Sequence, residues 1–84
     1  MLTSNEAVVR QVLLEVVQEI LPHVAVDEIA DHRSLGDLGA DSIERVEILV
    51  TVTERLAVGC PLSSLAGLPD LGALIGFLGE EGRR

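Results

Sequence analysis

Residues 37–49 read DLGADSIERVEIL, and in this stretch a loop gives way to a helix. Asp41 is a favourable N-cap residue, and Glu44 follows three positions later, which is the spacing of a capping box. Beyond the cap, acidic and aliphatic residues recur at helical intervals. The stretch therefore predicts a helix from Ser42 to about Leu56, with Ser42 in its first turn.

The helix predicted for residues 42–56 carries apolar side chains on two sides. One set forms an ordinary core stripe: Ile48, Leu49, Val52 and Leu56. A second, rotated stripe consists of Ile43, Val46 and Val50, interleaved with Glu44 and Glu47. Such a helix is either unusually buried or keeps one side for a partner. Because a small domain cannot easily bury a whole helix, the pattern favours a partner-binding stripe.

The N-terminal half is predicted to contain a helix and a long loop. Residues 5–21 form a helix whose stripe is Val9, Val12, Leu13, Val16, Val17 and Ile20. Thr3 and Glu6 have capping-box spacing, and Pro22 ends the helix. Residues 22–40 show no sustained period but hold apolar anchors: Val24, Val26, Ile29, Leu35 and Leu38. We expect an ordered loop with one helical turn at residues 27–30.

The C-terminal part predicts two more helices. A short one covers residues 62–66 and ends at Gly67, and a longer one starts near Pro69, a residue tolerated at the first helical position. The core face of the longer helix is Leu71, Leu74, Ile75 and Leu78. No strand pattern with a period of two occurs. The predicted fold is all-α: a four-helix bundle of three main helices and one short helix, with a long ordered first loop.

The composition predicts one small domain that spans residues 1–84, with ends that fray at residues 1–4 and 80–84. With one Phe, no Trp and no Tyr, its core must be aliphatic. A single Cys excludes a disulfide framework, and with two His it cannot form the usual four-ligand zinc site. The fold must therefore depend on packing.

The charge balance excludes several partners. Fourteen acidic and six basic residues give a net charge of −8, which argues against nucleic acid and anionic lipid surfaces. Composition alone favours the simpler interpretation that this charge keeps the domain soluble. The longest uncharged run, residues 56–69, is 14 residues long and too short for a membrane span. With no visible secretory signal, we expect a cytoplasmic protein.

Autonomous catalysis is not indicated. Ser42 is the obvious nucleophile, but its surroundings do not match G-x-S-x-G, and His23 and His32 lie in the loop as solvated side chains. Cys60 has no basic neighbour to activate it. Ser42 has a second role open to it as a modification site, because the first turn of a helix favours a phosphate.

Residues 37–49, together with chain length, acidity and helix order, resemble the acyl carrier protein family. The family signature is a Gly-x-Asp-Ser-[Leu/Ile] turn followed by an acidic, Val-rich helix, and residues 39–43 match it. The resemblance covers nearly the whole chain. It implies a carrier without autonomous catalysis, because a separate phosphopantetheinyl transferase modifies the serine.

The resemblance assigns roles residue by residue. Ser42 would carry 4′-phosphopantetheine, taken from coenzyme A, and Asp41 would help the transferase to dock. The positions that match the family's partner surface are Ile43, Glu44, Val46, Glu47, Val50 and Glu54. Partners would be the transferase, and ketosynthases, acyltransferases and other synthase enzymes with basic patches. The carrier itself is expected to be a monomer.

The subtype and one alternative also follow from the sequence. Residues 41–48, DSIERVEI, look most like carriers of polyketide synthases and polyunsaturated fatty acid synthases. Met1 and the short tail favour a free-standing carrier. The alternative is an unmodified helical adaptor whose double-striped helix docks a protein. Phosphopantetheine loading at Ser42 discriminates between the two.

Overall fold

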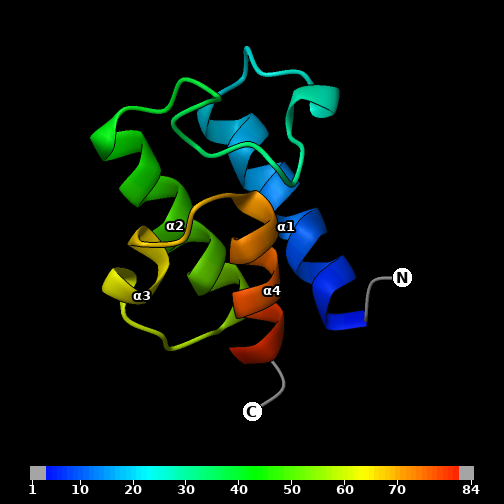
Figure 1. Ribbon diagram of the computed structural model, residues 1–84, viewed down its shortest axis with the longest axis vertical. Coiled ribbons are helices and arrows are strands. Elements are labelled where there is room, and N and C mark those ends of the chain that lie inside the picture. The colour runs from blue at the N-terminus through cyan, green and yellow to red at the C-terminus, as the bar shows by residue number, and fades with distance from the viewer. Residues whose placement is uncertain (1–3, 82–84) are drawn as a thin grey trace.

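The computed structural model describes residues 4–81, and this part of the chain contains four α-helices and one short 3-10 helix. In order they are α1 (Ser4–Ile20), η1 (Val26–Glu28), α2 (Ser42–Leu56), α3 (Leu62–Ala66) and α4 (Leu71–Glu81). α1 packs against α2 and α4, and α3 packs against α2 (Figure 1). The predicted all-α, four-helix bundle with three longer helices is confirmed.

The α1 helix buries the stripe that its sequence predicts. Val9, Leu13, Val16 and Val17 are buried, and Val12 and Ile20 pack partly buried against the core. The helix begins at Ser4, and the proposed capping residue Thr3 lies outside the described residues. Leu21 follows the last helical residue, and its N–H still donates to the Val17 carbonyl at 2.7 Å.

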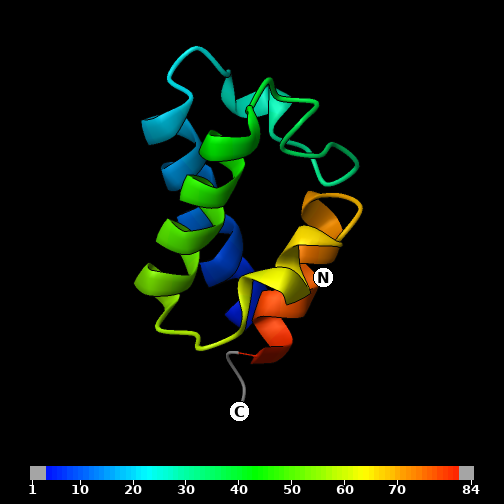
Figure 2. The same cartoon turned by 90° about the vertical axis from the view of Figure 1, so that its left-hand side faces the viewer.

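The long loop between α1 and α2 is ordered, as predicted, and lies across one end of the bundle (Figure 2). Val24, Leu35 and Leu38 are buried, but the expectation for Val26 is wrong, since that residue is 53% exposed. The helical turn spans Val26–Glu28, whereas residues 27–30 were expected, so it starts one residue earlier and ends two residues earlier. The Glu28 carboxylate accepts the Ala25 N–H at 3.3 Å, which starts the turn at this point.

The loop is held against the start of α4. The N–H groups of Leu71 and Gly72 donate to the carbonyls of Arg33 and Asp31, both at 2.9 Å. A Cβ at position 72 would lie 3.2 Å from the Asp31 Cβ, so glycine allows this close approach. The prediction that α4 starts near Pro69 is wrong. Asp70 caps the helix instead, because its carboxylate accepts the Ala73 N–H at 2.9 Å.

The core is aliphatic, as the composition requires. From α2 it takes Ile48, Leu49 and Val52, and from α4 it takes Leu71, Leu74, Ile75 and Leu78. Leu56 and Phe77 are partly buried at its edge. Of the residues expected to fray, Ser4, Glu80 and Glu81 are helical, and the others lie outside the described part of the chain. No helix within residues 4–81 is long and apolar enough to cross a membrane.

An ion pair fastens the loop to α1. The Arg10 guanidinium binds both carboxylate oxygens of Asp31, at 2.6 and 2.8 Å. The hydrogen bond from Arg10, and secondarily its charge, lower the pKa of Asp31 below the ordinary value of 3.8, against the opposing effect of desolvation. A lowered folded-state pKa means that the pair stabilises the fold above the unfolded-state pKa and stops doing so as the pH falls through the folded-state value.

Asp31→Asn is therefore expected to destabilise the protein at neutral pH. The loss should be at most about 1 kcal/mol, because both side chains retain contact with water. Urea unfolding at several pH values measures it. The difference from the wild type should shrink as the pH falls below 3.8. A difference that persists unchanged in acid would show that charge is not the cause.

Candidate functional site

Ser42 is the first residue of α2, and its position is set by a cap that does not use its own side chain. The Asp41 carboxylate accepts the Glu44 N–H at 2.8 Å, and the Glu44 carboxylate accepts the Asp41 N–H at 3.0 Å. This is the capping box that the sequence predicts. The Ser42 side chain is left exposed to solvent.

The turn before Ser42 is built by local hydrogen bonds. Ser34 and Asp37 bond reciprocally: the Ser34 N–H donates to the Asp37 carboxylate at 3.0 Å, and the Asp37 N–H donates to the Ser34 hydroxyl at 3.1 Å. The hydrogen bond from the Ser34 N–H is the main reason why the pKa of Asp37 lies below its ordinary value. Gly39 has a φ of 95°, a left-handed conformation that favours glycine. Next to it, Ala40 is buried and donates its N–H to the Leu35 carbonyl at 3.1 Å. The chain therefore enters α2 in a fixed direction.

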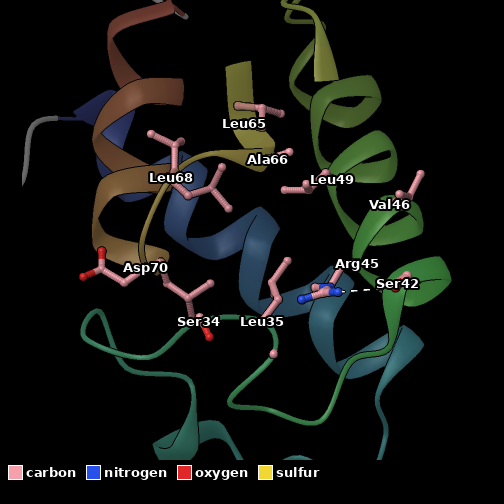
Figure 3. A pocket seen from close by; sticks show the side chains of 13 residues that line it. Ser34, Leu35, Ser42, Arg45, Val46, Leu49, Leu65, Ala66, Leu68 and Asp70 are labelled. Carbon is pink, nitrogen blue, oxygen red and sulfur yellow. Dashed lines mark hydrogen bonds between the residues drawn. The ribbon is translucent and has the colours of Figure 1, made fainter. Parts of the chain in front are cut away.

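The Ser42 hydroxyl faces an arginine one turn along the helix. The Arg45 Nη2 donates to the Ser42 Oγ at 3.4 Å (Figure 3). The i and i+3 spacing on α2 brings the two side chains together. No role was predicted for Arg45, although its spacing of three residues from Ser42 indicates the contact.

A cleft of about 410 Å³ opens beside Ser42. Its walls come from α2, α3, the start of α4 and the loop, with Arg45, Val46 and Leu49 on the α2 side (Figure 3). The aliphatic lining from the rest of the chain is Leu35, Leu65, Leu68, Leu71 and Leu74. Ser42, Ser34 and Asp70 add polar groups. An apolar cleft next to an exposed hydroxyl suits a group that is attached at Ser42 and carries an apolar cargo.

The second stripe of α2 faces solvent, as the sequence suggested. Ile43 is 78% exposed, Val46 45% and Val50 39%. Glu47 and Glu54 are also exposed, and their spacing from Ile43 places them on the same face. Glu44 is half-buried in the capping box and lies to one side of this face. We call Ile43, Val46, Glu47, Val50 and Glu54 the α2 surface. Val46 joins it to the cleft.

The remaining candidates for chemistry are separate from Ser42. His23 and His32 are exposed in the loop, and within residues 4–81 the Ser42 hydroxyl has Arg45 as its hydrogen-bond partner. Cys60 is a free, partly buried thiol beyond the end of α2. The described residues contain no group of three or more His, Cys, Asp or Glu that could hold a metal. Among the described residues, Ser42 thus stands apart from these groups as an exposed serine beside the cleft.

Comparison with known protein families gives one match over most of the chain. Residues 11–78 match the family PP-binding, described as the phosphopantetheine attachment site. This range contains the capping box, Ser42, the α2 surface and the whole of the cleft lining.

Three curated proteins are similar in sequence to this chain. The polyketide biosynthesis acyl-carrier-protein AcpK of Bacillus subtilis is 34% identical over 71 residues, which is 84% of this chain and 87% of AcpK. The non-reducing polyketide synthases ausA of Emericella nidulans and adrD of Penicillium roqueforti are 33% and 36% identical over 62% and 71% of this chain. Each match covers 2% of the synthase. The search of solved structures gave no significant match.

Proposed function

Because this chain belongs to the phosphopantetheine-binding acyl carrier family, we propose that it carries acyl intermediates of polyketide biosynthesis as thioesters on a 4′-phosphopantetheine arm attached to Ser42. The observation that carries this assignment is the position of Ser42. Its exposed hydroxyl stands at the first residue of α2, beside the apolar cleft. The family match favours this function over an unmodified adaptor.

The attachment uses the Ser42 hydroxyl as an acceptor. Its Oγ forms a bond to the phosphorus that bears the pantetheine in coenzyme A, and the pyrophosphate bond to that phosphorus breaks. The products are a serine phosphodiester and 3′,5′-ADP, and the hydroxyl proton leaves to a base of the transferase. Carrier proteins of this family are not catalysts, so the activating groups belong to the transferase. This chain contributes the accessible hydroxyl oxygen of Ser42, and the Asp41–Glu44 capping box fixes the backbone on either side of that residue.

The cleft supports the carrier role because it can shelter the acyl group that the arm carries. The arm, when bound, supplies a terminal thiol that holds the acyl group as a thioester. The aliphatic walls of the cleft, whose volume is about 410 Å³, offer that acyl group a place away from water. Polyketide biosynthesis is proposed because AcpK, a relative of similar length, is named as a carrier of that process.

The α2 surface is proposed to meet the partner enzymes. Exposed aliphatic side chains flanked by carboxylates fit a partner with an apolar centre and a basic rim, such as a transferase, ketosynthase or acyltransferase. Asp41 lies beside Ser42 and is proposed to contact the transferase. A monomeric state and a cytoplasmic location stay predictions.

Intact-protein mass spectrometry tests the attachment. The protein is incubated with coenzyme A and a broad-specificity phosphopantetheinyl transferase, and a gain of one 4′-phosphopantetheine is expected. Peptide mapping should place it on the tryptic peptide that contains Ser42. A folded protein that gains nothing, while a control carrier is fully converted, would overturn the proposal.

Glu44→Gln combined with Glu47→Gln is expected to slow association with the transferase. Removing two charges beside the docking site weakens electrostatic steering, so the association rate at low salt should fall by roughly two- to tenfold, with a flatter salt dependence. Gln at position 44 can still complete the capping box, so helicity should be kept. Stopped-flow association kinetics measure the effect.

The matched control removes two charges from η1, as Asp27→Asn with Glu28→Gln. These residues lie in the loop at the same end of the bundle as the start of α2, but at the opposite edge of that end (Figure 1). This variant should associate at close to the wild-type rate. Equal slowing by both pairs would assign the effect to net charge and not to the α2 surface.

A further inference from the structure

Within residues 4–81, Arg45 is the cation that contacts the Ser42 hydroxyl, and no described carboxylate binds its guanidinium. Its Nη2 lies 3.4 Å from the Ser42 Oγ. Among the described residues Arg45 makes no ion pair, whereas Arg10 and Arg55 bind Asp31 and Glu19. A guanidinium without an anionic partner beside a site of modification is free to bind the group that the modification adds.

We propose that Arg45 is a positioning residue, which binds the phosphodiester formed on Ser42 and turns the arm toward the cleft. This inference rests on the proposed attachment at Ser42. A phosphorus bonded to Oγ carries two non-bridging oxygens, which share one negative charge, one bond further out. A guanidinium that already meets Oγ can therefore reach one of them with a small rotation of its side chain.

The negative charges around Ser42 explain why a contact between Arg45 and the phosphodiester would be favourable. Asp41 and Glu44 flank the serine, and a phosphodiester adds another negative charge beside them. Both carboxylates are committed to the capping box, where each accepts a backbone N–H. Arg45 supplies the positive charge that offsets their repulsion of the phosphate.

The direction in which Arg45 would turn the arm follows from the spacing of residues along α2. Arg45 and Leu49 stand three and seven residues after Ser42, so all three lie along one side of α2, and all three line the cleft. Ile43, Glu47 and Val50 belong to the adjacent α2 surface. A phosphate bound by Arg45 is therefore drawn to the cleft side of Ser42 and away from the α2 surface.

The first experiment uses the loaded protein. Phosphorus NMR is recorded for the wild type, Arg45→Gln and Arg45→Lys at about 10 mM and about 1 M salt, between which the Debye length falls from about 30 Å to about 3 Å. In the wild type the phosphodiester shift should depend on salt, and in Arg45→Gln this dependence should be lost. Arg45→Lys keeps the charge without the planar fork and should retain part of it. Arg55→Gln, with the same charge change at the far end of α2, should match the wild type.

Amide NMR of the same samples reports the direction of the arm. Loading should perturb the cleft residues Leu49 and Leu65 more than Glu47 and Val50 on the α2 surface in the wild type. In Arg45→Gln this bias should fall by about two- to fivefold, the range expected for an exposed charge contact. Identical phosphorus and amide spectra for the wild type and Arg45→Gln would overturn the role of Arg45. Absence of loading in the wild type would instead overturn the attachment itself.

A second experiment needs no transferase, so it tests the proposal even if the Arg45→Gln variant is not loaded. The chain is made with phosphoserine at position 42, whose second pKa is normally about 6. Arg45 should lower that pKa relative to the same protein with Arg45→Gln, because a nearby cation favours the dianion. Asp41 and Glu44 are present in both proteins, so their opposing effect cancels in the comparison. Equal pKa values would overturn the proposal.

Discussion

Ser42→Ala is expected to abolish phosphopantetheine loading and to leave the fold intact. The loss should be complete, because no other oxygen can replace the one that forms the phosphodiester. The stability should change by no more than about 0.5 kcal/mol. The start of α2 is capped by Asp41 and Glu44, and the exposed Ser42 hydroxyl contributes only a 3.4 Å contact with exposed Arg45.

Two measurements are needed together for this variant. Intact mass after incubation with coenzyme A and transferase reports loading, and urea unfolding followed by circular dichroism reports stability. Ser63→Ala removes another exposed hydroxyl, on α3, and should load fully. Loading of Ser42→Ala at a different residue would contradict the assignment. Unfolding of Ser42→Ala would show that the hydroxyl has a structural role that the capping box does not explain.

Ile48→Ala is expected to have the largest effect on stability, and Ile43→Ala to have almost none. Both changes remove the same atoms from α2. Ile48 is fully buried at 0% exposure, whereas Ile43 is 78% exposed. Truncation of a buried isoleucine costs about 2–5 kcal/mol through lost burial and the cavity left behind. At an exposed site the cost stays within about 0.5 kcal/mol.

Urea unfolding of the two isoleucine variants checks this contrast. Since small domains are stable by only about 5–15 kcal/mol, Ile48→Ala should lower the midpoint strongly or leave a partly unfolded protein. Ile43→Ala should unfold like the wild type and, if the α2 surface is the docking site, should raise the transferase KM with little change in kcat. Equal destabilisation by both would show that α2 is rotated from the orientation described.

The sequence predicted the features that local chemistry controls. The Asp41–Glu44 capping box fixes the first residue of α2, so the helix Ser42–Leu56 was predicted with its observed bounds. The two-sided apolar pattern separated Ile48 and Val52, which are buried, from Ile43 and Val50, which are exposed. The family signature at residues 39–43 pointed to Ser42.

Local rules failed where the loop meets the bundle. Pro69 is a favourable first helical residue, yet α4 starts at Leu71, because Asp70 caps it and the loop carbonyls accept the N–H groups of Leu71 and Gly72. Val26 was expected to anchor the loop, but the turn initiated at Ala25 leaves it exposed. In the first case the decisive hydrogen bonds come from residues far away in the sequence. In the second case a local side-chain hydrogen bond sets the start of the turn.

By itself, then, the sequence determined the helices, the aliphatic core, the exposed stripe of α2 and the serine at its start, because capping and periodicity operate within a few residues of one another. The tertiary structure decided the rest. The cleft exists only because α2, α3, α4 and the loops leave space between them, and its leucines come from five separate segments, including Leu68 in the connection between α3 and α4. Packing also decided that the side of α2 bearing Ser42 and Arg45 lines that cleft, which no local pattern encodes.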